Sequence, residues 1–91
     1  MSLLGARISA DGNITISTGA TGALKLNAGV YELVFERNVT QCIYSAVSYD
    51  NAEPIFVQPR SGNANGVFIM FENDTGTFID SQFYLTVYCP K

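Results

Sequence analysis

Residues 30–36 read Val-Tyr-Glu-Leu-Val-Phe-Glu, and large apolar side chains recur at every second position of this segment. One side of an extended chain would hold the side chains of Tyr31, Leu33 and Phe35. The two glutamates and the two valines would lie on the other side. Because successive side chains of a β-strand alternate between its faces, this pattern predicts a strand with one buried face.

Gly, Asn and Asp residues interrupt the rest of the chain about every eight to twelve residues, and β-branched and aromatic residues fill the segments between them. Asp11-Gly12-Asn13 predicts a hairpin turn, residues 18–22 a flexible loop, and residues 55–57 a short edge strand between Pro54 and Pro59. We expect strands over residues 6–10, 14–17, 23–27, 30–36, 41–49, 55–57, 67–72 and 82–89. This spacing is typical of a small antiparallel β-sandwich or barrel of about seven to eight short strands.

The chain has 91 residues, which predicts a single β domain spanning residues 1–91. A domain this short buries only roughly 60–65% of its unfolded surface, and it often depends on a disulfide, a metal or a partner subunit. Only 14% of the residues are charged, whereas 47% are hydrophobic. Either neutral polar residues or another chain must therefore cover part of the outside.

The net charge is −3, and the five basic residues are scattered at Arg7, Lys25, Arg37, Arg60 and Lys91. This distribution gives no basic patch, so we do not expect a nucleic-acid partner. Apolar runs such as residues 67–71 are too short to span a bilayer, so we expect no membrane span. The N-terminus lacks the pattern of a signal peptide, and residues 1–3 could be a remnant of cloning.

Three of the expected strands, 41–49, 67–72 and 82–89, have apolar or aromatic side chains on both faces. A sheet with one face in water should instead alternate apolar with polar residues. Either the chain's own loops or another copy of the chain could cover the second face. We favour another copy, because so small a domain has few spare loops. The residues of the expected interface are Ile43, Val47, Tyr49, Phe68, Met70, Tyr84 and Tyr88.

Histidine is absent, so neither a Ser-His-Asp nor a Cys-His catalytic arrangement can be built from this chain alone. The remaining candidates for acid–base chemistry or calcium binding are loop carboxylates at Asp50, Glu53, Glu72, Asp74 and Asp80. Residues 72–76 are rich in oxygen ligands but lack the EF-hand spacing, which favours a polar turn. We expect no catalytic site, no metal site and no cofactor.

Cys42 and Cys89 are the only cysteines, and both fall on the expected core faces. They could form a disulfide or remain two buried thiols, and we favour the disulfide. Closing the long loop between them would stabilise the fold by roughly 4 kcal/mol, and a disulfide indicates an oxidising compartment outside the cytosol. Glycosylation sequons at Asn13, Asn38 and Asn73 are compatible with an exposed protein.

Residues 29–44, 57–59, 62–69 and 83–89 together resemble a bacterial β-domain family of uncharacterised function. That family reads G-x-Y-x-V-x-F-x-R-x-V-x-x-C-x-Y, V-x-P, G-N-x-N-G-V-F-V and F-x-L-x-V-x-C. The likeness covers roughly residues 5–89, its cysteines are its most specific part, and the loop at residues 48–53 is shorter here than in many members. It implies an exported or virion-borne module near the end of a larger surface or fibre-like protein.

We therefore expect a non-catalytic structural module that self-associates, with a trimer as one candidate assembly, at an extracellular, cell-surface or virion-associated location. The alternative is a monomeric module that binds carbohydrate or a cell surface through its tyrosines and its loop Asn and Asp residues.

Overall fold

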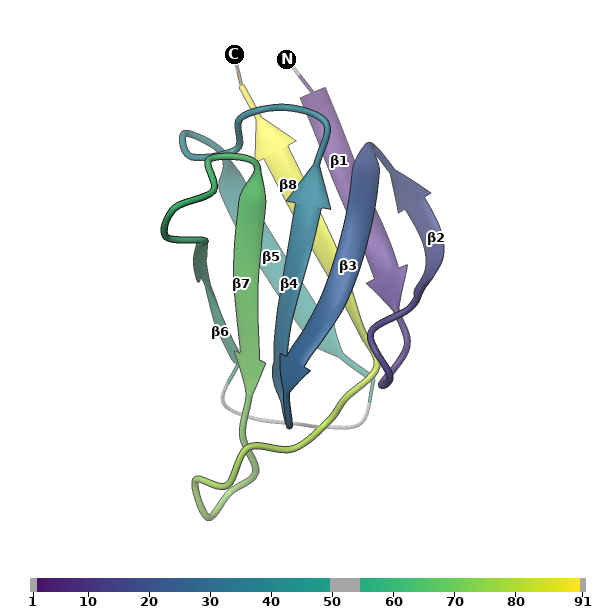
Figure 1. Cartoon of the computed structure of the whole chain (residues 1–91), viewed down its shortest axis with the longest axis vertical. Helices are drawn as coiled ribbons and strands as arrows, with labels where there is room; N and C mark the ends of the chain where they lie inside the picture. The colour runs from purple at the N-terminus through teal and green to yellow at the C-terminus, as the bar shows by residue number, and fades with distance from the viewer. Residues whose placement is uncertain (1, 50–54, 91) are drawn as a thin grey trace.

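The computed structural model describes residues 2–49 and 55–90, which form two antiparallel four-stranded sheets packed face to face (Figure 1). The strands are β1 (Ser2–Ile8), β2 (Ile14–Thr18), β3 (Ala20–Asn27), β4 (Val30–Phe35), β5 (Ile43–Ser48), β6 (Ile55–Pro59), β7 (Gly66–Phe71) and β8 (Phe83–Cys89). The first sheet has the order β2-β1-β8-β5, and the second has the order β3-β4-β7-β6. The predicted small all-β sandwich is confirmed.

The core lies between the sheets and contains the alternating apolar side chains that the sequence predicts. The inward faces of β4, β7 and β8 are fully buried, and the partly buried Cys42, Tyr44 and Ala46 pack against them. At the centre, the Tyr31 ring lies 5.8 Å from the Phe71 ring and 5.1 Å from the Phe83 ring, measured between centroids. These edge-on and tilted contacts are the arrangements that aromatic rings favour, so they fix the spacing of the two sheets.

The prediction of a flexible loop at residues 18–22 is wrong. β2 ends at Thr18 and β3 begins at Ala20, so the chain passes from the first sheet to the second at Gly19 alone. Gly19 has a φ of 81°, and a Cβ atom there would lie 2.5 Å from Cδ2 of Leu4. Its carbonyl accepts a hydrogen bond from the backbone N–H of Glu36 at 2.9 Å. One side of the sandwich is therefore closed by a covalent corner (Figure 1).

The predicted edge strand is confirmed, since β6 lies at the edge of the second sheet.

At the chain's beginning, Ser2 and Leu3 belong to β1 and pair with Cys89 and Tyr88 of β8, so both residues are part of the sheet. Residues 50–53 of the loop in which the sequence departs from the family pattern lie outside the described residues.

The connection between β7 and β8 is anchored to the core by Tyr31 and Asp80. The buried Tyr31 hydroxyl donates to the carbonyl of Ala10 at 2.7 Å and accepts from the N–H of Ser81 at 3.2 Å. Asp80 accepts from the N–H of Gly29 at 2.8 Å and from Nζ of Lys25 at 2.5 Å. Turns that are distant in the sequence are thereby held together at one end of the sandwich.

Candidate binding face

The outer face of the first sheet consists of three rows of side chains that cross its strands. The pairing registers place Ile16, Arg7, Tyr84 and Val47 in one row. The next row contains Thr18, Gly5, Thr86 and Ser45. A third row contains Leu3, Tyr88 and Ile43. Two rows of large side chains therefore flank a row of small ones, and this arrangement leaves a shallow groove across the sheet.

Two adjoining hollows, of about 380 Å³ and about 300 Å³, follow this groove. Gly5, Thr18 and Thr86 line both hollows, so these three small residues form their shared floor. At Gly5 an added Cβ atom would lie 3.1 Å from the carbonyl oxygen of Leu85. A larger residue at this position would therefore crowd the neighbouring strand as well as fill the groove.

Exposed apolar surface dominates this face. Six of its large apolar side chains are between 37% and 66% exposed, namely Leu3, Ile16, Ile43, Val47, Tyr84 and Tyr88. Arg7 is the one charged residue in the three rows. Its guanidinium carbon lies 4.7 Å from the centroid of the Tyr49 ring, and that ring meets Tyr84 edge-on at 4.5 Å between centroids.

The phenol of Tyr49, whose ring lies against Arg7, stays neutral. A side-chain hydrogen bond with Tyr84 and, secondarily, burial raise the pKa of Tyr49 above its ordinary value. Because the phenol of Tyr49 stays neutral, it adds no negative charge beside Arg7. Such a surface suits contact with an apolar or neutral partner better than contact with a strongly charged one.

The structure places the seven residues of the expected interface on two opposite surfaces. Five of the seven residues, on or next to β5 and β8, lie on the outer face of the first sheet. Phe68 and Met70 alternate along β7 with the core residues Val67, Ile69 and Phe71, and therefore lie on the outer face of the second sheet. The sequence pattern shows which side of a strand is apolar, but it does not show which sheet contains the strand.

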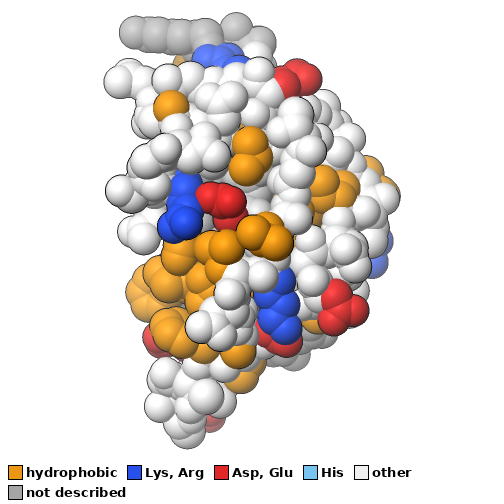
Figure 2. All heavy atoms as spheres, in the orientation of Figure 1, with side chains coloured by type: hydrophobic (Ala, Val, Ile, Leu, Met, Phe, Trp, Pro, Cys, Tyr) orange, Lys and Arg blue, Asp and Glu red, His pale blue; other side chains and the backbone are white. Residues whose placement is uncertain are grey.

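The second sheet has its own apolar patch, which includes the exposed Leu24, Leu26 and Phe56. Figure 2 views this sheet from outside and shows hydrophobic side chains gathered over one part of its surface, beside charged groups. Phe68 and Met70 are half-buried there, and Met70 pairs with the exposed Phe56 on β6. Arg60 lies 5.2 Å from the centroid of the Phe68 ring and forms a 2.7 Å ion pair with Glu32. These polar groups cover part of the patch.

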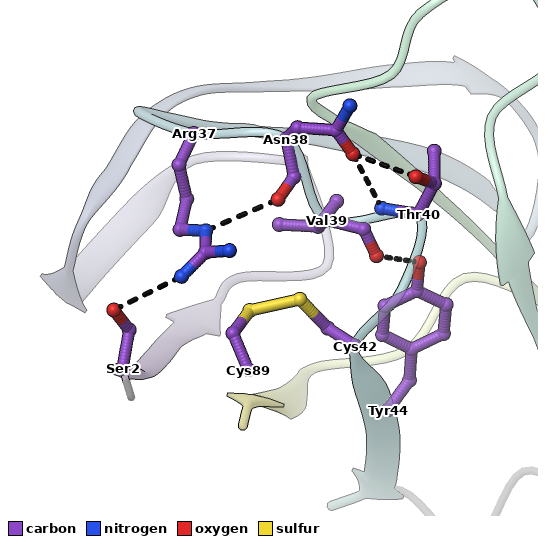
Figure 3. Close-up of a disulfide and its surroundings, with 8 residues drawn as sticks. All are labelled: Ser2, Arg37, Asn38, Val39, Thr40, Cys42, Tyr44 and Cys89. Carbon is purple, nitrogen blue, oxygen red and sulfur yellow. Dashed lines mark hydrogen bonds between the residues drawn. A yellow bond between two sulfur atoms is a disulfide. The ribbon is translucent and has the colours of Figure 1, made fainter. Parts of the chain in front are cut away.

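The predicted disulfide is confirmed between Cys42 and Cys89, whose Cα atoms are 4.4 Å apart (Figure 3). It joins the end of β8 to the residue before β5, beside the connection that links β4 to β5. In that connection the Tyr44 hydroxyl donates to the carbonyl of Val39, and Oδ1 of Asn38 accepts from the N–H and the hydroxyl of Thr40. The bridge therefore fastens an ordered connection to the sheet.

Asp80, one of the carboxylates considered for catalysis or calcium binding, has a structural role. Asp80 is paired with Lys25, as described above. Oδ1 of Asn73 accepts hydrogen bonds from the N–H and the hydroxyl of Thr75 and from the N–H of Thr77, which confirms the polar turn. Asp50 and Glu53 lie outside the described residues. Within the described part of the chain, no three His, Cys, Asp or Glu side chains lie close enough together to hold a metal ion.

Sequence reasoning missed several members of the candidate face, including Leu3, Ile16 and the floor of the groove. The alternation of Leu3, Gly5 and Arg7 along one side of β1 could have indicated them. The mixture of large and small residues at these positions concealed the pattern, and the pairing of β1 with both β2 and β8 became visible only in the fold.

The chain matches no family model, no curated protein and no solved structure. Fold and bonding therefore define its class, a small disulfide-bonded antiparallel β-sandwich. Within residues 2–49 and 55–90, no helix is long and apolar enough to cross a membrane.

Proposed function

We propose that this chain is a non-catalytic assembly module that self-associates through its first sheet. The observation that supports the proposal is the exposure of six large apolar side chains across one face whose rows contain a single charged residue, Arg7. A contiguous exposed apolar surface on a small soluble domain marks an interaction site, because leaving it in water is unfavourable.

We also propose where the protein is located. A structural disulfide suits an oxidising compartment, which supports an extracellular, cell-surface or virion-associated location. The resemblance of the sequence to a bacterial β-domain family supports a position near the end of a surface or fibre-like protein. A trimer and other small closed assemblies are compatible with this setting, and the mass of the assembly in solution distinguishes them.

Sedimentation equilibrium from low to high micromolar concentration tests the self-association. We expect the wild-type chain to associate and Val47→Lys to shift it toward monomer. Phe56→Lys is the matched control, because Phe56 is 43% exposed on the second sheet whereas Val47 is 52% exposed on the first. Circular dichroism verifies that both variants are folded. A wild-type chain that stays monomeric at high micromolar concentration would refute the proposal.

The groove supports a second candidate function, the binding of a carbohydrate by a monomer. Its floor offers the hydroxyl groups of Thr18 and Thr86, and its flanking rows hold the rings of Tyr84 and Tyr88. Hydroxyl groups can donate to and accept from sugar hydroxyls, and aromatic rings can cover the apolar face of a sugar.

A glycan array followed by calorimetry tests this second function. We expect a bound glycan to lose affinity for Thr86→Val, which keeps the shape of the side chain and removes the hydroxyl. Silence across the array, or affinity unchanged in Thr86→Val, would count against a glycan in this groove.

A further inference from the structure

The sandwich has four edge strands, and three of them have features that discourage pairing with another chain. β2 contains a register irregularity where it pairs with β1, and β3 contains two irregularities where it pairs with β4. β6 ends at Pro59, which has no N–H to donate. Bulges and edge prolines are devices by which natural sheets avoid edge-to-edge pairing.

β5 has none of these features. Its sequence, Ile-Tyr-Ser-Ala-Val-Ser, contains no proline and no charged residue, and it pairs with β8 over residues 43–48 without any shift in register. Ile43, Ser45 and Val47 are exposed on its outer face. A regular, uncharged edge strand of this kind is a template for an added strand.

The backbone of β5 also has the direction that strand addition requires. The N–H of Tyr49 donates to the carbonyl of Gln82 at 2.9 Å, so Tyr49 directs its backbone groups toward the β8 side. Because this direction alternates along an antiparallel edge strand, Ser45 also faces β8, whereas Tyr44 and Ala46 direct their N–H and C=O groups away from the sheet. These groups can bond to an added strand without breaking the pairing with β8.

We propose that two copies of the chain join by antiparallel pairing of β5 with β5, which merges their first sheets into one sheet of eight strands. This inference rests on the proposed self-association and specifies its geometry. A second copy fits the edge because a strand of this sequence complements itself. With the two-fold axis at Ser45, the exposed Ile43 of one copy lies opposite the exposed Val47 of the other, and Tyr44 pairs with Ala46.

This geometry makes the assembly a closed dimer. Pairing identical strands about a two-fold axis uses the same surface on both copies, so the contact is complete with two chains and a third chain has no free β5 edge to join. The apolar face is then continuous over both copies. The dimer thus differs in mass from the trimer considered above.

Cysteine cross-linking tests the register directly. Across the proposed axis the two Ser45 residues form a pair without backbone hydrogen bonds, with Cα atoms roughly 4.5 Å apart, which is within the reach of a disulfide. We expect Ser45→Cys to give a covalent dimer under mild oxidation, as seen on a non-reducing gel. Thr86→Cys is the matched control, because Thr86 pairs with Ser45 in the same row but lies one strand inside the edge. We expect that variant to stay uncross-linked.

Lysine substitution provides an independent measurement. Ser45→Lys would place two like charges opposite each other across the axis, which destabilises strand pairing. We expect it to shift the dimer to monomer in sedimentation equilibrium, whereas Thr86→Lys should remain dimeric. If the wild-type chain associates but Thr86→Cys cross-links in place of Ser45→Cys, the face and not the edge forms the contact, and this inference fails while self-association stands. A wild-type monomer would overturn both.

Discussion

At the scale of single residues, Tyr31 connects the core to two turns. Its ring is fully buried among Phe71 and Phe83, and its hydroxyl is hydrogen-bonded to Ala10 and Ser81. Burial raises the pKa of Tyr31, so the phenol stays neutral and keeps its proton for donation to Ala10. The sequence predicted that this ring is buried, but the two partners of its hydroxyl depended on the tertiary fold.

We expect Tyr31→Phe to lower the free energy of unfolding by about 1–3 kcal/mol, because it leaves the partly buried carbonyl of Ala10 and the buried N–H of Ser81 without their partner. Guanidinium chloride denaturation measures the change. The ring and its packing are retained, so a loss of this size reports on the hydroxyl group. Unchanged stability would show that these two hydrogen bonds contribute nothing to the fold.

The Lys25–Asp80 ion pair, whose Nζ–Oδ2 distance is 2.5 Å, makes stability depend on pH at both extremes. Hydrogen bonds from Lys25 and from the N–H of Gly29 hold the pKa of Asp80 below its ordinary value of 3.8. Its contribution is therefore complete above pH 3.8 and is lost as the pH falls through the lowered pKa. The hydrogen bond with Asp80 raises the pKa of Lys25 above 10.5, so its contribution is complete below that pH and is lost above it.

Urea denaturation midpoints measured across acid and alkaline pH test this dependence. We expect Asp80→Asn to flatten both limbs of the profile relative to wild type, because it removes the titrating carboxyl and leaves Lys25 without its ionic partner. Both side chains are more than a quarter exposed, at 30% and 37%, so solvent screening keeps the effect small. Identical profiles for the two proteins would exclude a contribution from this pair.

At the scale of secondary-structure elements, the turn between β3 and β4 is held against the connection that leads to β8. Gly29 has a φ of 69°, and a Cβ atom there would lie 2.7 Å from both the backbone N and the backbone O of Ile79. The N–H of Phe71 donates to its carbonyl at 2.9 Å. Neither Ile79 nor Phe71 is near Gly29 in the sequence. The sequence therefore predicted the turn at Gly29 but not the residues that pack against this turn.

We expect Gly29→Ala to destabilise the protein much more than Gly62→Ala, as measured by thermal or chemical denaturation. Gly62 is the matched control, because its φ is 84° and an added Cβ would meet nothing within 4 Å. Gly62→Ala should therefore lower the free energy of unfolding by about 1–2 kcal/mol, the penalty of the left-handed conformation alone. Gly29→Ala adds a clash with backbone atoms, and equal effects at the two positions would contradict the packing described here.

At the scale of the whole molecule, the sandwich combines a small core with apolar surface on both outer faces. A domain of this size gains limited stability from its core, which makes the Cys42–Cys89 bridge and a partner subunit valuable. The low proportion of charged residues indicated an unusual surface. The division of that surface between two sheets could not be predicted, because it depends on which strands pair.

We expect the Cys42→Ala/Cys89→Ala double variant to lose roughly 4 kcal/mol of unfolding free energy, since the unfolded chain regains the freedom of a long loop. Guanidinium chloride denaturation at a concentration at which the protein is monomeric separates this effect from dissociation. Reduced wild-type protein should match the double variant. A loss well below 1 kcal/mol would indicate that the bridge adds little to the β5–β8 pairing.

The amino-acid sequence by itself determined most of the strands, their buried faces and several turns, because alternation and turn chemistry act between neighbouring residues. The strand expected over residues 6–10 lies at Ser2–Ile8, and the loop expected at residues 18–22 belongs largely to β2 and β3. The cysteine pair could also be expected, since both residues fall on core faces. Only the tertiary structure decided that β2 and β3 meet at Gly19, that Phe68 and Tyr84 belong to opposite surfaces, and that β5 is left as an uncharged edge. The physical reason is that β1 must pair with β8 across most of the chain, and contacts between such distant residues leave no local periodicity in the sequence.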